Sequence, residues 1–302
     1  MEVKDFSRWE EYKYNSTGSG RSEKIWLSSG NEIGLFKFPK QFTNGSITTE
    51  YISEKLASEI ASLLDIPCAK VEIGTYNGRL GSMSYKINKN NEFLMEGVSF
   101  INKSYPNYDI NTLYDPVKCV YYSFPMISPI IDGLHFEKEF VEMVVFDALI
   151  GNTDRHHSNW ALLVSFESPD NLKIHFCPLY DNGSSLCCYI NENDIDSFLG
   201  KDIRKLWSLV DSKSKSRIRI DASCKKEPTH LAVMTYLIQN EVYKNYFVSF
   251  SKKILERIDN KTINQLLDNY PNSMLSQKRK ELIQRFLIQK LIIIESVLEK
   301  RG

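Results

Sequence analysis

The sequence predicts an α+β chain of two lobes, a small β-rich lobe followed by a larger and mostly helical one. Within the first 90 residues, β-rich runs alternate with turn-forming residues around a single helical pattern. The rest of the chain holds long segments with apolar residues at helical spacing and only short β-rich runs. With 302 residues, of which 42% are hydrophobic and 12% aromatic, the chain can bury a sizeable core. We therefore place one lobe at residues 1–90 and the other at residues 91–302.

The first lobe is expected to contain two hairpins on either side of a helix. In residues 22–40, the β-rich runs KIWL and GLFKF flank the turn-forming string Ser-Ser-Gly-Asn. Residues 47–66 carry apolar side chains at every fourth position, with Thr48 or Thr49 as the candidate N-cap. Residues 69–87 contain two further β-rich runs around an Asn-Gly turn.

The second lobe is expected to be dominated by helices. Apolar stripes predict helices over residues 137–150, 230–248, 252–268 and 277–299. Between the first and second of these, the runs ALLVSF and KIHFCPLYD predict two short strands.

Charge and cysteine content exclude several classes of protein. Lysine plus arginine equals aspartate plus glutamate, 38 against 38, so we expect neither direct nucleic-acid binding nor a membrane surface as partner. The N-terminus lacks the apolar region of a secretory signal, and no run of about 18 apolar residues exists. The six cysteines form no C-x-x-C pair, which indicates reduced thiols in the cytoplasm.

A dense polar cluster lies near the middle of the chain, in the string LIGNTDRHHSNWALL. Asp154 and Asn159 are five residues apart there, and Asp181 follows 22 residues after Asn159 in PLYDNGSSL. A carboxylate can accept a proton from an attacking hydroxyl, whereas an amide oxygen and a second carboxylate can ligate Mg²⁺ together with phosphate oxygens. This division of roles is typical of phosphoryl transfer, where positioning and electrostatics supply most of the catalysis.

Two features upstream fit the same chemistry. Lys37 lies in the β-rich run GLFKF between apolar residues, so it needs an anionic partner. Nucleotide phosphates could be one, and Glu50 or Glu54 of the following helix could be another. Residues 16–20 (STGSG) precede the first hairpin and offer backbone amides that could surround phosphate groups.

At these motifs the chain resembles the HipA-like serine/threonine kinases. The strings GNTDRHHSN, PLYDNGSSL, FKFP and TEYISEKLA carry the resemblance, which runs from about residue 14 to the C-terminal helices. The chain is similar to the short members of the family, which lack an extra N-terminal subdomain. The resemblance implies a bilobal protein-kinase-like fold, ATP and Mg²⁺ as cofactors, and a protein substrate with a Ser or Thr acceptor.

The resemblance also implies roles for individual residues. These are Asp154 as the catalytic aspartate, Asn159 and Asp181 as the metal ligands, Lys37 and Glu50 at the nucleotide, Met83 at the hinge, and His156 as a brace of the catalytic loop beside the nucleotide. Ser19, Gly20 and Ser22 fall in the family's phosphate-binding loop, which carries an autophosphorylated serine. Because this chain has Ser22 where the family often has Gln, the modified residue is left open between Ser16, Ser19 and Ser22.

Several alternatives remain open at this point. The string DRHHSN also fits a phosphatidylinositol-type lipid kinase, and a nucleotide-binding pseudokinase would keep the same residues. Zinc binding by His156 and His157 is disfavoured because no Cys or H-E-x-x-H partner stands nearby. The basic run from Lys201 to Lys226 is interpreted as a solvated face, with a docking patch for an acidic or RNA-bound partner as the alternative.

The resemblance leaves the biological setting open. It is compatible with a toxin under antitoxin control and with an exported effector. We expect the protein in the bacterial cytoplasm, or exported by a route that leaves no signal peptide. The sequence does not predict the oligomeric state or the identity of the protein substrate.

Overall fold

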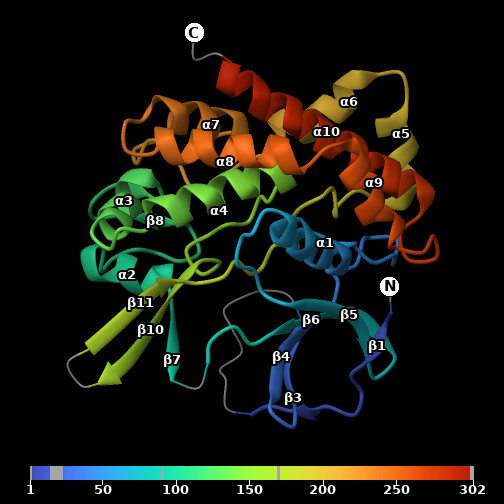
Figure 1. The fold of residues 1–302 in the computed structure, drawn as a ribbon, viewed down its shortest axis with the longest axis horizontal. Helices are drawn as coiled ribbons and strands as arrows, with labels where there is room; N and C mark the ends of the chain where they lie inside the picture. The colour runs from blue at the N-terminus through green and yellow to red at the C-terminus, as the bar shows by residue number, and fades with distance from the viewer. Residues whose placement is uncertain (1, 14–22, 90, 169–170, 300–302) are drawn as a thin grey trace.

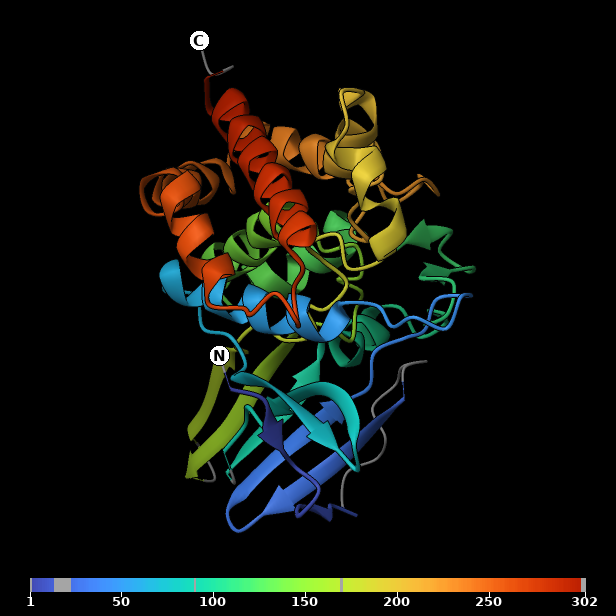
Figure 2. The same ribbon diagram turned by 90° about the vertical axis from the view of Figure 1, so that its right-hand side faces the viewer.

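The structure, a computed structural model, describes residues 2–13, 23–89, 91–168 and 171–299 (Figure 1). A curled six-stranded sheet forms one end and a stack of helices the other. Helix α1 (Glu50–Leu63) lies between them in both views (Figure 1, Figure 2). The mixed α+β class predicted from the sequence is confirmed, with the first sheet formed by N-terminal strands and most helices following it.

The six-stranded sheet has the order β1-β5-β6-β4-β3-β2. Its strands are β1 (Lys4–Asp5), β2 (Glu10–Glu11), β3 (Lys24–Ser29), β4 (Glu32–Lys37), β5 (Val71–Tyr76) and β6 (Arg79–Tyr85). Both expected hairpins are present, since β3 pairs antiparallel with β4 and β5 with β6. The two-residue strands β1 and β2 are too short to produce a periodic pattern, and the sequence analysis missed them.

The register of this sheet separates a polar face from an apolar one. Lys37 pairs with Lys24 on one side and with Ser82 on the other, so these three side chains share a face. The next pair, Phe36 and Met83, points to the opposite face. There it belongs to a buried cluster of Phe6, Leu27, Phe36, Phe38 and Met83.

Helix α1 packs against the helical part of the molecule. The expected helix over residues 47–66 is confirmed, although it is shorter, and Thr49 is the N-cap residue without a side-chain capping bond. Ile52, Leu56 and Ile60 are buried in the same core cluster as the helices of the C-terminal part. The sheet face around Phe36 forms a separate cluster.

A second, three-stranded sheet has the order β11-β10-β7. Strands β10 (Ala161–Ser168) and β11 (Asn171–Phe176) correspond to the two short strands that the sequence predicted. Strand β7 (Glu92–Glu96) pairs antiparallel with β10 and was not predicted. Its side chains are mostly half-buried, so the run EFLME shows no clear alternation of apolar and polar residues.

The C-terminal part contains most of the helices. They are α2 (Gly97–Ser104), α3 (Phe124–Asp132), α4 (Glu137–Ile150), α5 (Ile195–Leu199), α6 (Ile203–Trp207), α7 (His230–Gln239), α8 (Lys244–Arg257), α9 (Asn260–Asp268) and α10 (Gln277–Glu299). Strands β8 (Tyr114–Asp115) and β9 (Val120–Tyr121), the 3-10 turn Glu192–Asp194 and the π-helical turn Ser208–Ser212 lie between them. Among the described residues, no helix is both long and apolar enough to cross a membrane.

Two of the expected helices have the wrong limits. The predicted helix over 230–248 is broken because the side-chain oxygen of Asn240 accepts bonds from the backbone N–H groups of Val242 and Tyr243, at 2.9 and 3.2 Å. The predicted helix over 252–268 is interrupted by Asp259, whose carboxylate accepts a bond from the N–H of Thr262 and caps α9. Such local side-chain bonds compete with the helical backbone pattern, and hydrophobic periodicity does not detect them.

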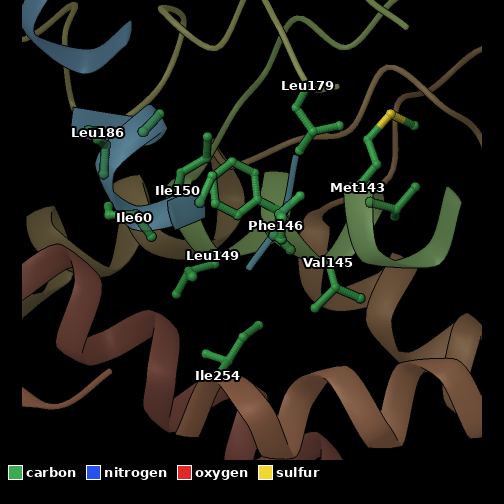
Figure 3. Close-up of a cluster of buried hydrophobic side chains, with 14 of the residues drawn as sticks. Ile60, Met143, Val145, Phe146, Leu149, Ile150, Leu179, Leu186 and Ile254 are labelled. Carbon is green, nitrogen blue, oxygen red and sulfur yellow. The ribbon is translucent and has the colours of Figure 1, made fainter. Parts of the chain in front are cut away.

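Helix α4 occupies the centre of the core. Every residue from Met143 to Ile150 is buried, so the second half of the helix is covered on all sides. Phe146 and Leu149 lie among side chains from several elements, and the labelled neighbours include Ile60 of α1 and Ile254 of α8 (Figure 3). The core therefore fixes the end of α4, from which the central polar loop begins.

A lysine side chain is buried inside this core. Lys290 of α10 is 1% exposed, and its Nζ donates to Oγ of Ser214 at 2.6 Å. The same hydroxyl contacts Nδ1 of His230 at 2.8 Å, and no described carboxylate forms an ion pair with Lys290. Burial without a counter-ion lowers the pKa of Lys290 to about 7.

We expect Lys290→Met to raise the free energy of unfolding by about 1–3 kcal/mol near neutral pH, because a buried cation without a counter-ion is costly. The pKa of Lys290 is lower in the folded chain, so the unfolded chain binds more protons between about pH 7 and pH 10. The free energy of unfolding should therefore increase with pH over that range, and it should increase more for the wild type than for Lys290→Met. Denaturant titrations at several pH values would measure this, with exposed Lys252→Met as the control. Equal pH slopes for Lys290→Met and wild type would contradict it.

Candidate active site

A cleft of about 680 Å³ opens between the six-stranded sheet, α1 and the loops that follow α4 and β11. Its lining includes Lys24, Lys37 and Ser82 of the sheet, Glu50 and Glu54 of α1, and Asn111, Asp154, His156, Asp181, Gly183 and Arg217 of later loops. The polar face of the sheet thus meets the central polar loop. Most of the charged residues singled out in the sequence converge in this one cleft.

The end of α4 sets the position of the Asp154 loop. Gly151 ends the helix with φ 68°, and a Cβ at this position would lie 2.5 Å from a ring carbon of Phe286. Only glycine combines this backbone conformation with the available space. Asn152 then donates to the carboxylate of Asp147 at 2.9 Å and accepts a bond from the N–H of Asp154 at 3.1 Å. The loop is therefore attached to the helix that precedes it.

Arg155 connects the two loops that carry the aspartates of the cleft. Its Nε and Nη2 each donate to the carboxylate of Asp147 at 2.8 Å. Nη1 donates to the carbonyl oxygen of Asn159 at 2.6 Å and to that of Tyr180 at 2.7 Å. Nη2 donates a second bond, to Oδ1 of Asn182 at 2.6 Å. Arg155 and Asp147 are both buried, so this is a paired and fully bonded internal charge.

We expect Arg155→Ala to lower the free energy of unfolding by about 3–5 kcal/mol, because the substitution leaves Asp147 charged, buried and unpaired. Denaturant unfolding measures this difference directly. Arg204→Ala is the matched control, since Arg204 is exposed and pairs only with its neighbour Asp202. An effect of Arg155→Ala no larger than that of the control would show that the network contributes little.

Asp154 and Asn159 both present an oxygen that has no protein donor. Arg217 approaches Oδ1 of Asp154 with Nη2 at 3.3 Å and Nε at 3.4 Å, and no described residue donates to Oδ2. The Asn159 amide donates through Nδ2 to the carbonyl oxygen of Asp154 at 2.8 Å. Its Oδ1 accepts no hydrogen bond from the residues that the structure describes. A carboxylate oxygen and an amide oxygen are thus available on one short loop.

Asp181 lies at the start of the neighbouring loop in a strained conformation. Its φ of 56° is in the left-handed region, which is uncommon for a residue with a side chain and typical of functional sites. The N–H of the next residue, Asn182, donates to Oε1 of Glu54 at 2.9 Å. At Gly183, a Cβ would lie 3.0 Å from Oε2 of Glu54, so glycine allows the loop to approach α1 closely.

Lys37 reaches both carboxylates from the sheet. Its Nζ lies 2.8 Å from Oδ1 of Asp181 and 3.8 Å from Oε2 of Glu54. Burial favours the neutral amine, but the charges of Asp181 and Glu54 outweigh it and raise the pKa of Lys37. Burial alone would raise the pKa of Asp181, yet the charge of Lys37 lowers it to about 2. Lys37 and Asp181 are therefore both ionised at neutral pH.

The partner of Lys37 on α1, left open between Glu50 and Glu54 in the sequence, is Glu54. Glu50 lines the cleft, but its carboxylate contacts Lys40 at 2.9 Å, Thr48 at 2.6 Å and Tyr189 at 2.6 Å. Glu54 lies one helical turn further along α1 and faces Lys37. Its buried position raises the pKa of its carboxyl group.

The two adjacent histidines have different surroundings. His156 lines the cleft, and its Nδ1 accepts a bond from the N–H of Ser158 at 3.2 Å. His157 contacts the hydroxyl of Tyr108 through Nδ1 at 2.9 Å, and burial lowers its pKa to about 4. Among the described residues, no three His, Cys, Asp or Glu side chains come together as metal ligands. All six cysteines are free thiols.

Four of the expected nucleotide-binding residues have no side chain described in the cleft lining. Ser19, Gly20 and Ser22, together with Ser16, lie outside the described residues. Met83 is fully buried in the apolar cluster on the far face of the sheet, and its neighbour Ser82 lines the cleft instead. The expected position of Met83 at the hinge stays a prediction, and its buried side chain means that only its backbone could contact a nucleotide.

Lys24, Lys40 and Arg217 are cationic residues of the cleft to which the sequence analysis assigned no role. Lys24 is the cross-strand neighbour of Lys37, a relation that depends on the strand register. Arg217 follows Asp154 by 63 residues and belongs to the basic run interpreted as a solvated face. The predicted β3–β4 hairpin brings Lys24 to Lys37, whereas no local pattern links Arg217 to the motifs, because its proximity to Asp154 arises only from the tertiary fold.

Comparison with known proteins adds independent information. No family model matches the chain. The serine/threonine-protein kinase CtkA of Helicobacter pylori is 24% identical over 311 residues, which cover 100% of this chain and 89% of CtkA. The solved structure of that proinflammatory kinase superposes with a TM-score of 0.80 at 22% identity, covering 99% of this chain and 98% of CtkA.

A more distant structure belongs to HipA of Shewanella oneidensis MR-1, solved in a complex with HipB and operator DNA. It superposes with a TM-score of 0.58 at 14% identity, covering 96% of this chain and 68% of HipA. The chain is homologous to CtkA over its full length, and it shares its fold with CtkA and HipA. The resemblance expected from its motifs is thereby confirmed. The bilobal kinase fold is confirmed as well, because the chain matches the CtkA structure over nearly its full length.

Proposed function

We propose that the chain is an ATP-dependent serine/threonine protein kinase of the HipA-like type. Full-length homology to the serine/threonine-protein kinase CtkA supports this activity and implies a protein acceptor. The observation that carries the proposal within this chain is the convergence of Lys37, Asp154 and Asp181 in one cleft. They reach it from three different elements, and such positioning of charged groups around one centre supplies most of the catalysis of phosphoryl transfer.

Asp154 would orient the acceptor hydroxyl and take up its proton. The carboxylate faces the cleft with Oδ2 free of donors from the described residues, while Arg217 approaches Oδ1. A general base needs an accessible lone pair and a fixed orientation. The bonds of Asn152 and Asn159 to the Asp154 backbone provide that orientation.

Asn159 and Asp181 fit a Mg²⁺ ion. The amide oxygen of Asn159 accepts no bond from the described residues, and the Asp181 carboxylate is ionised because Lys37 lowers its pKa. Mg²⁺ prefers such oxygen ligands and completes its shell with phosphate oxygens and water. When bound, the ion would neutralise charge on the transferred phosphoryl group. Lys37, oriented by Glu54, would contact the nucleotide phosphates.

The remaining sequence-based expectations continue as proposals. Ser19, Gly20 and Ser22 would contact the nucleotide, and one of Ser16, Ser19 and Ser22 would be autophosphorylated. A phosphate in that loop would add negative charge beside the nucleotide site. The lobe limits of 1–90 and 91–302, the cytoplasmic location, and a toxin or effector role also belong to the proposal.

The rival activities are less well supported. A lipid kinase is disfavoured because the full-length relative is a serine/threonine-protein kinase. A pseudokinase is disfavoured because the lysine and both aspartates line one cleft, and the asparagine is bonded to the backbone of Asp154 behind it.

The proposal is tested by incubating the purified chain with γ-labelled ATP, with and without Mg²⁺. The acceptors would be the chain itself, a mixture of denatured proteins, and phosphoinositide vesicles. We expect Mg²⁺-dependent label on protein serines or threonines, mapped by mass spectrometry. Label on vesicles alone would indicate a lipid kinase, and nucleotide binding without transfer to any acceptor would indicate a pseudokinase.

A further inference from the structure

A short basic segment, residues 213–229, adjoins the catalytic loop. It contains six Lys or Arg residues against two acidic ones, in a chain whose total charge is zero. Its Arg217 lines the cleft and lies 3.3 Å from the carboxylate of Asp154. One residue of this basic segment therefore lies beside the proposed catalytic base.

The first half of the basic segment has an alternating pattern of burial. Ser214, Ser216 and Ile218 are buried, whereas Lys213, Lys215 and Arg217 between them reach the surface. The backbone is not a regular strand here, since Lys213 is in the helical region (φ −94°, ψ −12°) and Lys215 makes only an isolated bridge with Thr229. Along the chain these three cations make up a row at the surface, and its last member, Arg217, lies beside Asp154.

The backbone of this row is tied to the rest of the molecule. The N–H of Ser216 donates to the carbonyl oxygen of Pro228 at 3.0 Å, and the N–H of His230 to that of Ser214 at 2.9 Å. The carbonyl oxygen of Arg219 accepts a bond from the N–H of Phe124 at 2.8 Å. The positions of the cations relative to the cleft are thus set by the fold.

Internal carboxylates neutralise the arginines but not the lysines. Glu227 lies 2.8 Å from Nη1 of Arg217 and 3.9 Å from Nη2 of Arg219. Asp221 accepts bonds from its own loop neighbour, Ser223. Within the described chain, no ion pair involves the lysines of the segment, which are Lys213, Lys215, Lys225 and Lys226. Their charges are available to a partner.

We infer that the basic segment binds an acidic stretch of the acceptor protein, next to the Ser or Thr that enters the cleft. This inference rests on the proposed kinase function and names the substrate class of that site. Opposite charges on two surfaces steer and orient the partners, and the row supplies positive charge that reaches Asp154 through Arg217. Carboxylates close to the acceptor residue would pair with the lysines while the hydroxyl lies at Asp154.

A polypeptide fits the segment better than a nucleic acid does. Non-specific binding of single strands uses aromatic side chains as stacking platforms beside the basic groups. Residues 213–229 contain no Phe, Tyr or Trp. The chain also has no overall positive charge that would favour a polyanion over a local acidic sequence.

The test compares peptide acceptors that share a central serine. The flanking residues at alternate positions are glutamate, glutamine or lysine. We expect the wild type to label the glutamate peptide with the lowest KM. Lys213→Glu combined with Lys215→Glu should raise that KM roughly tenfold, with kcat within about twofold, because exposed charge contacts affect binding rather than chemistry.

The matched control is Lys252→Glu combined with Lys261→Glu, which makes the same change of charge on exposed positions of α8 and α9. Fluorescence anisotropy of labelled peptides, without ATP, measures binding separately from transfer. A single-stranded oligonucleotide serves as competitor. Thermal unfolding verifies that both double variants are folded.

The outcomes separate this inference from the function on which it rests. A rise in KM for the glutamate peptide in Lys213→Glu/Lys215→Glu, absent in the control, supports it. Equal labelling of the three peptides, or equal KM in both double variants, overturns it and leaves the kinase function intact. Tighter binding of the oligonucleotide than of the glutamate peptide overturns it in favour of nucleic acid. If the wild type labels no protein or peptide, the proposed function itself fails.

Discussion

Asp154→Ala is expected to lower kcat for protein phosphorylation by about 10²–10⁴-fold, the usual contribution of a positioned general base. The KM for ATP should stay within about twofold, because Asp154 acts on the acceptor hydroxyl and not on the nucleotide. The side chain accepts bonds only from Arg217 among the described residues, so its loss should not unfold the chain. Steady-state transfer of labelled phosphate from ATP measures both constants.

Two further variants sharpen this result. Asp154→Asn keeps the shape of the side chain but cannot accept the proton, so it should be nearly as inactive as the alanine variant. Asp202→Asn, on the exposed surface, should behave as wild type. Wild-type kcat in Asp154→Asn would remove Asp154 from the role of base, whatever the other assignments.

Asp181→Asn is expected to lower kcat by at least about a hundredfold, because a metal ion supplies several kcal/mol of charge stabilisation in phosphoryl transfer. The amide is a weaker ligand for Mg²⁺ than the carboxylate. The variant should also need a higher Mg²⁺ concentration for half-maximal ATP binding. Calorimetric titration of ATP at a series of Mg²⁺ concentrations measures this shift independently of turnover.

The control for this experiment is the carboxylate on the other side of Lys37. Glu54→Gln removes the second negative partner of Lys37 without removing a proposed metal ligand. It should weaken ATP binding while leaving the Mg²⁺ requirement unchanged. If Asp181→Asn and Glu54→Gln shift the Mg²⁺ requirement equally, Asp181 does not have the specific role proposed here.

The sequence predicted those helices and hairpins whose limits are set by residues within or next to the element. Helix α4 was predicted with its observed limits, since its segment is apolar at helical spacing and followed by glycine. The β3–β4 and β5–β6 hairpins follow from turn residues between β-rich runs. The break between α7 and α8 was missed because one side chain, Asn240, competes with the helix through local hydrogen bonds.

The residues of the candidate site that belong to short motifs were predictable from the sequence. Those that the tertiary structure brings together from distant segments were not. Asp154 and Asp181 belong to compact strings, and both line the cleft. The choice between Glu50 and Glu54 depends on the rotation of α1 about its axis relative to the sheet, which helical spacing alone does not determine. Arg217 meets Asp154 through contacts far apart in sequence, so no string near either residue indicates the pair.

The division of the apolar core has a mechanical consequence for the cleft. Helix α1 with Glu54 belongs to the large cluster around α4, and Arg155 joins the loops of Asp154 and Asp181 to the same body. Lys37 instead lies on β4, whose buried side chains belong to the separate cluster with Phe36. Ile73 of β5 also belongs to the large cluster, so the sheet is joined to α1 at that strand. A bending of the sheet toward β4 and β3 would displace Lys37 and Lys24 while the three carboxylates keep their mutual distances. Opening and closing of the cleft would then be a movement of two cations relative to fixed carboxylates.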